Sequence, residues 1–384
     1  MANGHHGWTG DEEHEMVAGD RSDRAAIQHG CVVLERQNAP LEAPRAEQVA
    51  RMNQRGGRRI GTHSKWHRNR SLFFLRPMKL SPIFVSLFLA TAALAGTPPT
   101  PGTGTFTTIE NLEYANVGGK SLQLDLRIPD GAGPFPVILY LHSGGWISGD
   151  RTGGPARRQA ARGYAVASID YRLAPEFIWP AQIEDCKAAV RWLRANAARF
   201  HLDPNRIGVW GTSAGGHLAS ILGTSSDRPE LEGLYLGNPQ FSSRVKVVID
   251  MYGPSDLLKL DDQKLPGTPL DGNASFMPPS LLLGCPVQQC REKAATASPM
   301  TYITKDDPPF LILQGMLDIL CPYQQSVDLY TALRLKGVPA TLHLLPTAQH
   351  ADQQFDEQKW QQTISDFLDA NLRGPLPVRR RAVR

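Results

Sequence analysis

The stretch RIGVWGTSAGGHLA, residues 206–219, joins a run of apolar, strand-forming residues to a run of helix-forming residues through a serine flanked by glycines. Gly211, Ser213 and Gly215 form the pattern Gly-x-Ser-x-Gly, in which the chain turns so tightly that a side chain at either glycine would clash. Such an elbow presents a serine hydroxyl at the top of a sheet, at the N-terminus of the next helix. Five small residues also produce this pattern by chance, so its meaning depends on the rest of the chain.

Length and charge limit what can surround this turn. The chain has 384 residues, 41% of them hydrophobic, and a formal net charge of +4. Since α/β domains often reach about 250 residues as one unit, a single large domain with flanking segments fits this length. The basic residues gather near the two ends, including a basic tail at residues 374–384. We therefore expect no nucleic-acid partner.

The five cysteines show no Cys-x-x-Cys spacing, so we expect no metal site. Cys285 and Cys290 bracket a short loop that contains a proline. Two alternatives follow for this pair, a local disulfide if the protein is exported or two free thiols. Cys186 falls within a predicted helix, where we expect it to be a small core residue.

The N-terminal part of the chain has features of an export signal rather than of a catalytic domain. Residues 1–77 lack hydrophobic periodicity and are rich in Arg, Gly and His, which predicts a disordered basic segment. Residues 78–95 have the layout of a signal peptide, with a basic start, a short apolar middle and a small-x-small end. The apolar run is too short to span a bilayer, so we expect a secreted or periplasmic protein with no stable membrane anchor after processing.

Signal peptides stand at true N-termini, and this one begins at Met78. We therefore hypothesise that translation begins at Met78 and that residues 1–77 reflect an upstream choice of start. The competing interpretation is an internal signal-anchor helix with a cytoplasmic basic tail. A linker rich in Pro, Thr and Gly follows at residues 96–105.

Strand-like and helix-like runs alternate through residues 106–373, which we interpret as one domain. The runs typical of strands are 106–116, 121–128, 135–141, 164–169, 206–210, 245–251, 310–314 and 340–345. The runs typical of helices are about 180–200, 214–222, 322–335 and 353–372. Residues 253–298 are rich in Pro, Gly and Asp, which predicts a lid insertion. The alternation predicts an α/β fold, a mostly parallel central sheet with helices on both faces.

Two residues further along the chain can serve the serine. Serine is a poor nucleophile unless a base lies within hydrogen-bond reach and an acid orients that base. Asp318 follows one predicted strand and His350 follows the next, which predicts a Ser213–His350–Asp318 triad. Taken singly, Asp318 could cap a helix and His350 could be a loop histidine. Asp256 is a rival acid, although it also resembles a helix cap.

Ester chemistry also needs donors aimed at the oxygen that becomes negative. The sequence HSGGW, residues 142–146, ends the run 135–141, and its glycines leave backbone N–H groups free. We predict an oxyanion hole made by the amides of Gly144, Gly145 and Ala214, with a plain glycine-rich turn as the alternative. We expect His142 to brace this loop and His217 to be structural.

These pieces resemble the α/β-hydrolase superfamily and, within it, bacterial carboxylesterases akin to hormone-sensitive lipases and feruloyl-esterase-like enzymes. The matching residues are 142–150, 170–176, 211–216, Asp318 and His350, within a span from about 106 to 372. The resemblance implies hydrolysis of carboxylic esters through an acyl-enzyme, without cofactor or metal. The substrate it implies is a small-molecule or polysaccharide-linked ester with a short acyl or an aryl group, such as acetyl or feruloyl.

The sequence departs from the family pattern at two places. Ser143 replaces the first glycine of the oxyanion loop, and we expect it to narrow the acyl side of the pocket. Neither Thr212 nor Gln349 is cysteine, so the disulfide of tannase-type enzymes is absent. Two other classes stay open: a serine peptidase of prolyl-oligopeptidase type, which usually carries a large extra domain, and a non-catalytic binding protein, which typically loses the serine or the histidine. The oligomeric state is left unknown.

Overall fold

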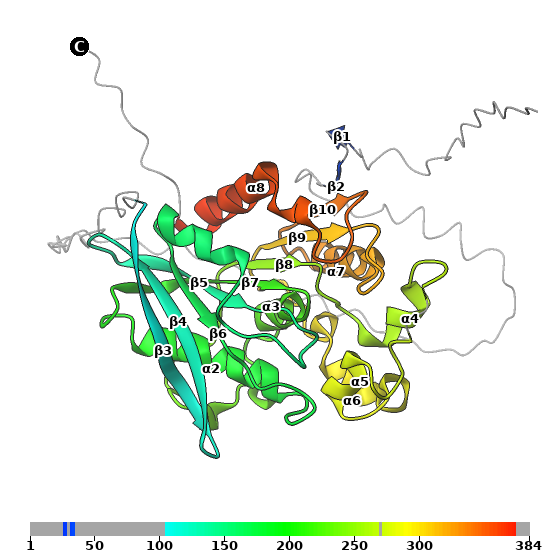
Figure 1. Cartoon of the computed structure of the whole chain (residues 1–384), viewed down its shortest axis with the longest axis horizontal. Coiled ribbons are helices and arrows are strands. Elements are labelled where there is room, and N and C mark those ends of the chain that lie inside the picture. The colour runs from blue at the N-terminus through cyan, green and yellow to red at the C-terminus, as the bar shows by residue number, and fades with distance from the viewer. Residues whose placement is uncertain (1–25, 29–30, 35–103, 269–270, 374–384) are drawn as a thin grey trace, which may run out of the picture. The chain divides into compact units, whose positions relative to one another are not determined.

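The structure is a computed structural model that describes residues 26–28, 31–34, 104–268 and 271–373. A mixed sheet runs through the described residues in the strand order β1-β2-β10-β9-β8-β7-β5-β6-β4-β3 (Figure 1). Its strands are β1 (Ala26–Gln28), β2 (Cys31–Leu34), β3 (Phe106–Val117), β4 (Lys120–Pro129), β5 (Phe135–Leu141), β6 (Ala165–Ile169), β7 (Leu202–Thr212), β8 (Val248–Met251), β9 (Phe310–Gly315) and β10 (Ala340–Leu345). The predicted signal peptide 78–95 and the basic tail 374–384 lie outside the described residues.

The centre of the sheet is parallel. Strands β6, β5, β7, β8, β9 and β10 pair in parallel. Every residue of β5 is buried, as expected of a strand covered on both faces. At one edge, β3 and β4 form an antiparallel hairpin whose turn is made by Gly118 and Gly119, with φ of 57° and 89°. All eight strands expected between residues 106 and 345 are present.

Helices cover both faces of this sheet. One face carries α2 (Ala181–Ala195), α3 (Ala214–Thr224) and α7 (Tyr323–Leu335), and the other carries η2 (Pro155–Arg162), α8 (Gln358–Leu368) and η9 (Asp369–Arg373). Figure 1 shows α8 on one side of the sheet and α2 and α3 on the other. Residues of β5 alternate between the two layers, with Leu139 in one core and Tyr140 in the other. The predicted α/β-hydrolase fold class is confirmed, and Cys186 is a buried core residue of α2.

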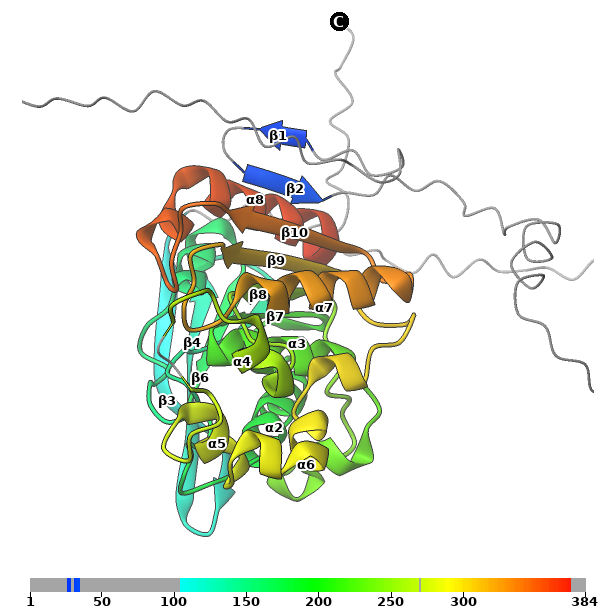
Figure 2. The same ribbon diagram turned by 90° about the vertical axis from the view of Figure 1, so that its right-hand side faces the viewer.

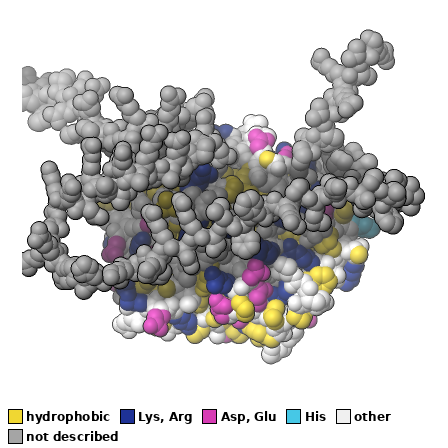
Figure 3. All heavy atoms as spheres, turned by 180° about the vertical axis from the view of Figure 1, so that it is seen from behind, with side chains coloured by type: hydrophobic (Ala, Val, Ile, Leu, Met, Phe, Trp, Pro, Cys, Tyr) yellow, Lys and Arg dark blue, Asp and Glu magenta, His cyan; other side chains and the backbone are white. Residues whose placement is uncertain are grey.

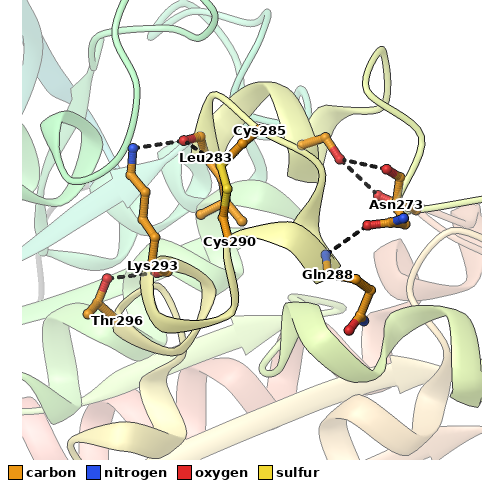
Figure 4. Close-up of a disulfide and its surroundings, with 9 residues drawn as sticks. Asn273, Leu283, Cys285, Gln288, Cys290, Lys293 and Thr296 are labelled. Atoms are coloured by element: carbon orange, nitrogen blue, oxygen red, sulfur yellow. Dashed lines mark hydrogen bonds between the residues drawn. A yellow bond between two sulfur atoms is a disulfide. The ribbon is translucent and has the colours of Figure 1, made fainter.

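The predicted insertion is a layer of short helices. It contains η5 (Leu257–Lys259), α4 (Leu260–Gln263), α5 (Pro278–Leu283), η6 (Val287–Gln289) and α6 (Arg291–Thr296). Figure 2 shows α5 and α6 side by side. Cys285 and Cys290 form a disulfide with their Cα atoms 6.3 Å apart, so the first of the two sequence alternatives holds (Figure 4). Lys293 closes the same loop by donating to the carbonyl oxygen of Leu283 at 2.7 Å.

Two short strands lie within residues 1–77, the segment for which the composition predicts disorder. β2 pairs antiparallel with β10, placing Val33 opposite His343, and β1 pairs antiparallel with β2. The sequence of β2 is CVVL, an apolar stretch with two β-branched residues, and the edge of β10 offers backbone groups for such a strand. The composition of residues 1–77 taken as a whole does not reveal this short strand-forming run.

On the face seen in Figure 3, basic and acidic side chains are interspersed with hydrophobic ones wherever grey atoms leave the surface visible. Within the ranges that the structure describes, none of the helices combines the length and the hydropathy that a membrane span requires.

Candidate active site

The turn that joins β7 to α3 has the geometry predicted for a nucleophile elbow. Ser213 has φ 55° and ψ −119°, a left-handed conformation that costs a residue with a side chain about 1–3 kcal/mol. The Ser213 amide donates to the carbonyl oxygen of Met251 at 2.8 Å, which helps to hold this conformation. A Cβ atom at Gly211 would overlap the backbone of Gly215, and one at Gly215 would overlap the carbonyl oxygen of Leu141. Both flanking positions therefore require glycine.

The structure brings the three predicted triad residues together. His350 Nε2 lies 2.8 Å from Ser213 Oγ, and His350 Nδ1 lies 2.6 Å from Asp318 Oδ2. Asp318 is an acceptor, so Nδ1 carries the proton and Nε2 is free to accept the serine proton. The His350 side chain is 15% exposed, whereas Asp318 is fully buried. The histidine therefore reaches the solvent-facing side of the site while its orienting acid lies beneath.

Asp318 is held by donors from its own loop and from β9. Its Oδ1 accepts the backbone N–H groups of Leu320 and Cys321 at 2.9 and 2.8 Å. Its Oδ2 accepts the side-chain amide of Gln314 at 3.1 Å, and Ser326 donates to the carbonyl oxygen of that amide at 3.0 Å. Gln314 was not predicted, although a glutamine inside the apolar strand FLILQG is itself a signal of a buried polar contact.

The rival acid has a different place in the fold. Asp256 caps η5, where its side chain accepts the backbone N–H of Leu258 at 3.1 Å, and it lies 3.7 Å from the ammonium group of Lys259. It makes no contact with His350 among the described residues. The helix-cap interpretation is therefore the correct one for Asp256.

The predicted oxyanion donors lie beside the elbow. Gly144 and Gly145 follow β5 with φ of 116° and 60°, and in the described chain no acceptor is bonded to either amide. Ala214 is the first residue of α3, where backbone N–H groups have no partner within the helix. The positive end of the α3 dipole adds to the attraction for a developing anion. The role of these three amides as oxyanion donors stays a prediction.

Two histidines near the site are structural. Burial lowers the pKa of His217 to about 4. The Nδ1 atom of His217 accepts the indole N–H of Trp146 at 3.2 Å, and its Nε2 donates to the carbonyl oxygen of Ala297 at 2.6 Å. His142 donates from Nδ1 to the carbonyl oxygen of Ser143 at 2.6 Å, stacks on Tyr171 and has its pKa lowered by burial. His142 braces the loop, and His217 joins it to the elbow helix and the lid.

One aromatic contact of the triad was not anticipated. The ring of Tyr252 meets the ring of His350 edge-on with centroids 4.9 Å apart. Tyr252 follows β8 with φ 47°, another strained residue at the same edge of the sheet. In the parts of the chain that the structure describes, no group of three or more His, Cys, Asp or Glu side chains is arranged to hold a metal ion.

The sheet, the elbow and the Ser–His–Asp geometry together define an α/β-hydrolase fold with an assembled triad. The chain belongs to the BD-FAE family, whose family model matches residues 124–333. The family resemblance drawn from the sequence motifs is thereby confirmed.

Three known proteins illustrate the relationship. The probable carboxylic ester hydrolase LipM of Mycobacterium tuberculosis is 32% identical over 274 residues, which are 67% of this chain and 60% of that protein. Esterase LipC of the same organism is 34% identical over 224 residues, 56% of this chain and 53% of that protein. The chain thus spans less than two thirds of the length of these relatives. A truncated carbohydrate esterase from gut microbiota shares 28% identity with a TM-score of 0.60, over 70% of this chain and 97% of that structure.

Proposed function

We propose that this protein is a serine carboxylesterase that hydrolyses carboxylic esters through an acyl-enzyme. The observation that carries the proposal is the continuous hydrogen-bonded line from Ser213 through His350 to the buried Asp318, with distances of 2.8 and 2.6 Å. Similarity to LipM and LipC, which are named as ester hydrolases, supports the same activity.

In the proposed reaction, Ser213 Oγ attacks the ester carbonyl carbon while His350 Nε2 takes its proton. The carbonyl oxygen becomes negative and is stabilised by the amides of Gly144, Gly145 and Ala214. His350 then gives the proton to the leaving alcohol, and the acyl group stays on Ser213. A water molecule, deprotonated by His350, releases the acid and restores the serine. Asp318 keeps His350 in the tautomer that this sequence requires.

We infer that the substrates are short acyl or aryl esters, with acetyl or feruloyl groups on polysaccharide as the candidates. Three large apolar side chains of the acid loop are about half exposed beside the triad: Leu317, Ile319 and Leu320. Ile147 of the oxyanion loop is 37% exposed. These side chains offer an apolar contact to an acyl or aryl group. Similarity to a carbohydrate esterase supports a sugar-linked alcohol.

A substrate panel with a Ser213→Ala control tests the activity. We expect turnover of p-nitrophenyl acetate and butyrate, weaker turnover of the laurate, and loss of turnover in Ser213→Ala. Preferential cleavage of aminoacyl anilides would instead assign a peptidase of the prolyl-oligopeptidase type. Absence of any turnover by a correctly folded protein would assign a non-catalytic binding protein. Acetylated and feruloylated oligosaccharides then separate the two candidate substrates.

We further propose that the protein is exported, with cleavage after the signal peptide 78–95. The Cys285–Cys290 disulfide supports this proposal, because disulfides persist in oxidising compartments. N-terminal sequencing of the exported protein should place its first residue near Gly96. Recovery of an intact Met1 on exported material would contradict both this cleavage and the proposed start at Met78.

A further inference from the structure

Thr212, the residue before the nucleophile, is the centre of a buried group of hydroxyls. Its Oγ1 lies 3.0 Å from the hydroxyl of Tyr140 on β5 and 2.7 Å from Oγ of Ser143 in the oxyanion loop. Thr212 and Tyr140 are both buried, and Ser143 is half-buried. These bonds connect Thr212, at the end of β7, to the end of β5 and the loop after it, which lie 72 and 69 residues earlier in the sequence.

Tyr252 is also affected by this side chain. Burial raises the pKa of the Tyr252 phenol, and the Thr212 side chain lowers it. A threonine hydroxyl can donate once and accept twice, so it can serve these neighbours together. Because the Tyr252 ring also packs on His350, the Thr212 group adjoins both the oxyanion loop and the triad base.

The oxyanion loop needs such an anchor. Gly144 and Gly145 both have positive φ, and glycines lose more conformational freedom on ordering than any other residue. On the far side, the Gly144 carbonyl oxygen accepts the amides of Ile147 and Ser148 at 3.1 Å each. On the near side, the Ser143 hydroxyl ties the loop to Thr212. A glycine at position 143, as in the family pattern, would leave this second bond unmade.

We propose that Ser143 and Thr212 are positioning residues that fix the oxyanion loop relative to Ser213 through their hydroxyl–hydroxyl bond. They act through the direction of the Gly144 and Gly145 amides and do not touch the reacting atoms. This inference rests on the proposed esterase function. It gives Ser143, which stands where the family pattern has glycine, a role in transition-state stabilisation, because the Ser143 hydroxyl bonds to Thr212.

The test uses variants that remove one hydroxyl at a time in the full chain. Thr212→Val deletes the central hydroxyl with almost no change of shape, and Ser143→Ala deletes its loop partner. The two changes are also combined. Thr212→Ser keeps the hydroxyl and serves as the rescue variant. Thr224→Val is the matched control, since the buried Thr224 hydroxyl in α3 bonds only to backbone, at 3.0 Å from the Ser220 carbonyl oxygen.

Each single hydroxyl deletion should lower kcat for p-nitrophenyl acetate about 10- to 100-fold, because misplacing a catalytic group by about 1 Å lowers the rate by up to about 100-fold. KM should change less than about threefold. Phenylboronic acid, which adds to the serine hydroxyl as a tetrahedral anion, should bind more weakly by a similar factor. The double variant should lose no more than the worse single variant, as expected when both residues make one bond. Thr212→Ser and Thr224→Val should stay within about threefold of the unchanged protein.

Three results would overturn the inference. The first is a kcat of Thr212→Val within about twofold of the unchanged protein. The second is a loss of kcat in the double variant equal to the product of the two single losses. The third is a loss of kcat in Thr224→Val as large as that in Thr212→Val. Unfolding temperatures identify any variant that loses activity through instability, and Ser143→Ala, in a half-buried loop, is the second route to the answer. Failure of the esterase function itself is distinct, because the unchanged protein would then show no ester turnover that Ser213→Ala abolishes.

Discussion

Asp318 is the residue on which the tautomer of His350 depends. We expect Asp318→Asn to lower kcat about 10⁴-fold, the scale of losing the correct histidine tautomer in a serine triad. An asparagine amide can present its NH₂ group to Nδ1, which moves the ring proton to Nε2, where it faces Ser213. Steady-state kinetics with p-nitrophenyl acetate measures the loss, and the melting temperature checks the fold.

Asp256 provides the matched control for that substitution. It is the alternative acid in the sequence, and the structure places it at the start of η5. Asp256→Asn should leave kcat within about twofold and cost about 1 kcal/mol or less, since asparagine also caps helices well. If Asp256→Asn lost as much activity as Asp318→Asn, the assignment of the acid would be refuted.

At the residue scale, the sequence predicted the groups that carry chemical signals and missed those that support them. Ser213, Asp318 and His350 each follow a strand, so their order and spacing brought them to one edge of the sheet. Thr212 has no comparable signal, and Gln314 has only its position as a glutamine inside an apolar strand. The partner of Gln314 is Asp318, four residues further along the chain, whereas Thr212 contacts Ser143, 69 residues earlier, which only the register of the folded sheet brings near.

At the scale of elements, the elbow brings the start of helix α3 into close backbone contact with β5. A Cβ atom at Gly215 would fall on the carbonyl oxygens of Leu141 and His142, which are backbone atoms of β5 and the loop after it. We expect Gly215→Ala to lower the free energy of unfolding by about 3 kcal/mol or more, the upper range for overpacking. Urea denaturation measures this change.

Gly153 is the control, because a Cβ there meets no atom within 4 Å and the residue needs no positive φ. Gly153→Ala should change stability by about 0.5 kcal/mol or less. Equal stability of the two variants would mean that the elbow does not press on β5 as described.

The lid depends on its disulfide. Cys285 and Cys290 close a loop with a sequence separation of 5 within a layer of very short helices. Loop-closure entropy for so short a loop gives about 2 kcal/mol of stabilisation. The double variant Cys285→Ser/Cys290→Ser should therefore show faster proteolysis of the lid and a lower melting temperature. Dithiothreitol should reproduce both effects in the unchanged protein and add nothing in the variant; unchanged proteolysis in the variant would contradict this account.

The strands were predictable and the lid helices were not. Continuous apolar runs such as Phe135–Leu141 are buried on both faces, so their pattern is strong over the whole element. The helices α5 and α6 have six residues each, too short for a periodic signal. The closing helix 353–372 was predicted as one element, but Glu357, with ψ 143°, separates η8 (Gln353–Asp356) from α8. Helix α8 then continues directly into the π-helical turn η9.

At the scale of the whole molecule, two buried groups have opposite effects on how stability depends on pH. They are His217 in the elbow helix and Asp250 in the neighbouring strand β8. Burial lowers the pKa of His217 to about 4 and raises the pKa of Asp250 to about 7. Asp250 accepts from Ser220 at 2.6 Å and from the Gly253 amide at 2.9 Å, which limits that rise. Neither shift has the other group among its causes, so their contributions to stability can be separated by substitution.

Between pH 4 and 6.5 the unfolded chain binds a proton at His217 that the folded protein does not bind. The contribution of neutral His217 to stability is therefore complete above pH 6.5 and is lost as the pH falls toward 4. Between pH 3.8 and 7 the folded protein keeps a proton on Asp250 that the unfolded chain releases, so that contribution is complete below pH 3.8 and is lost as the pH rises toward 7. The full changes are about 3 and about 4 kcal/mol at 1.36 kcal/mol per pKa unit. These two changes largely cancel in the unchanged protein.

Relative to the unchanged protein, His217→Gln should lose unfolding free energy as the pH rises from 4 to 6.5. Over the same window, Asp250→Asn should gain unfolding free energy. Urea denaturation of all three proteins across this window measures both slopes, and slopes of the same sign in the two variants would contradict the opposed titrations.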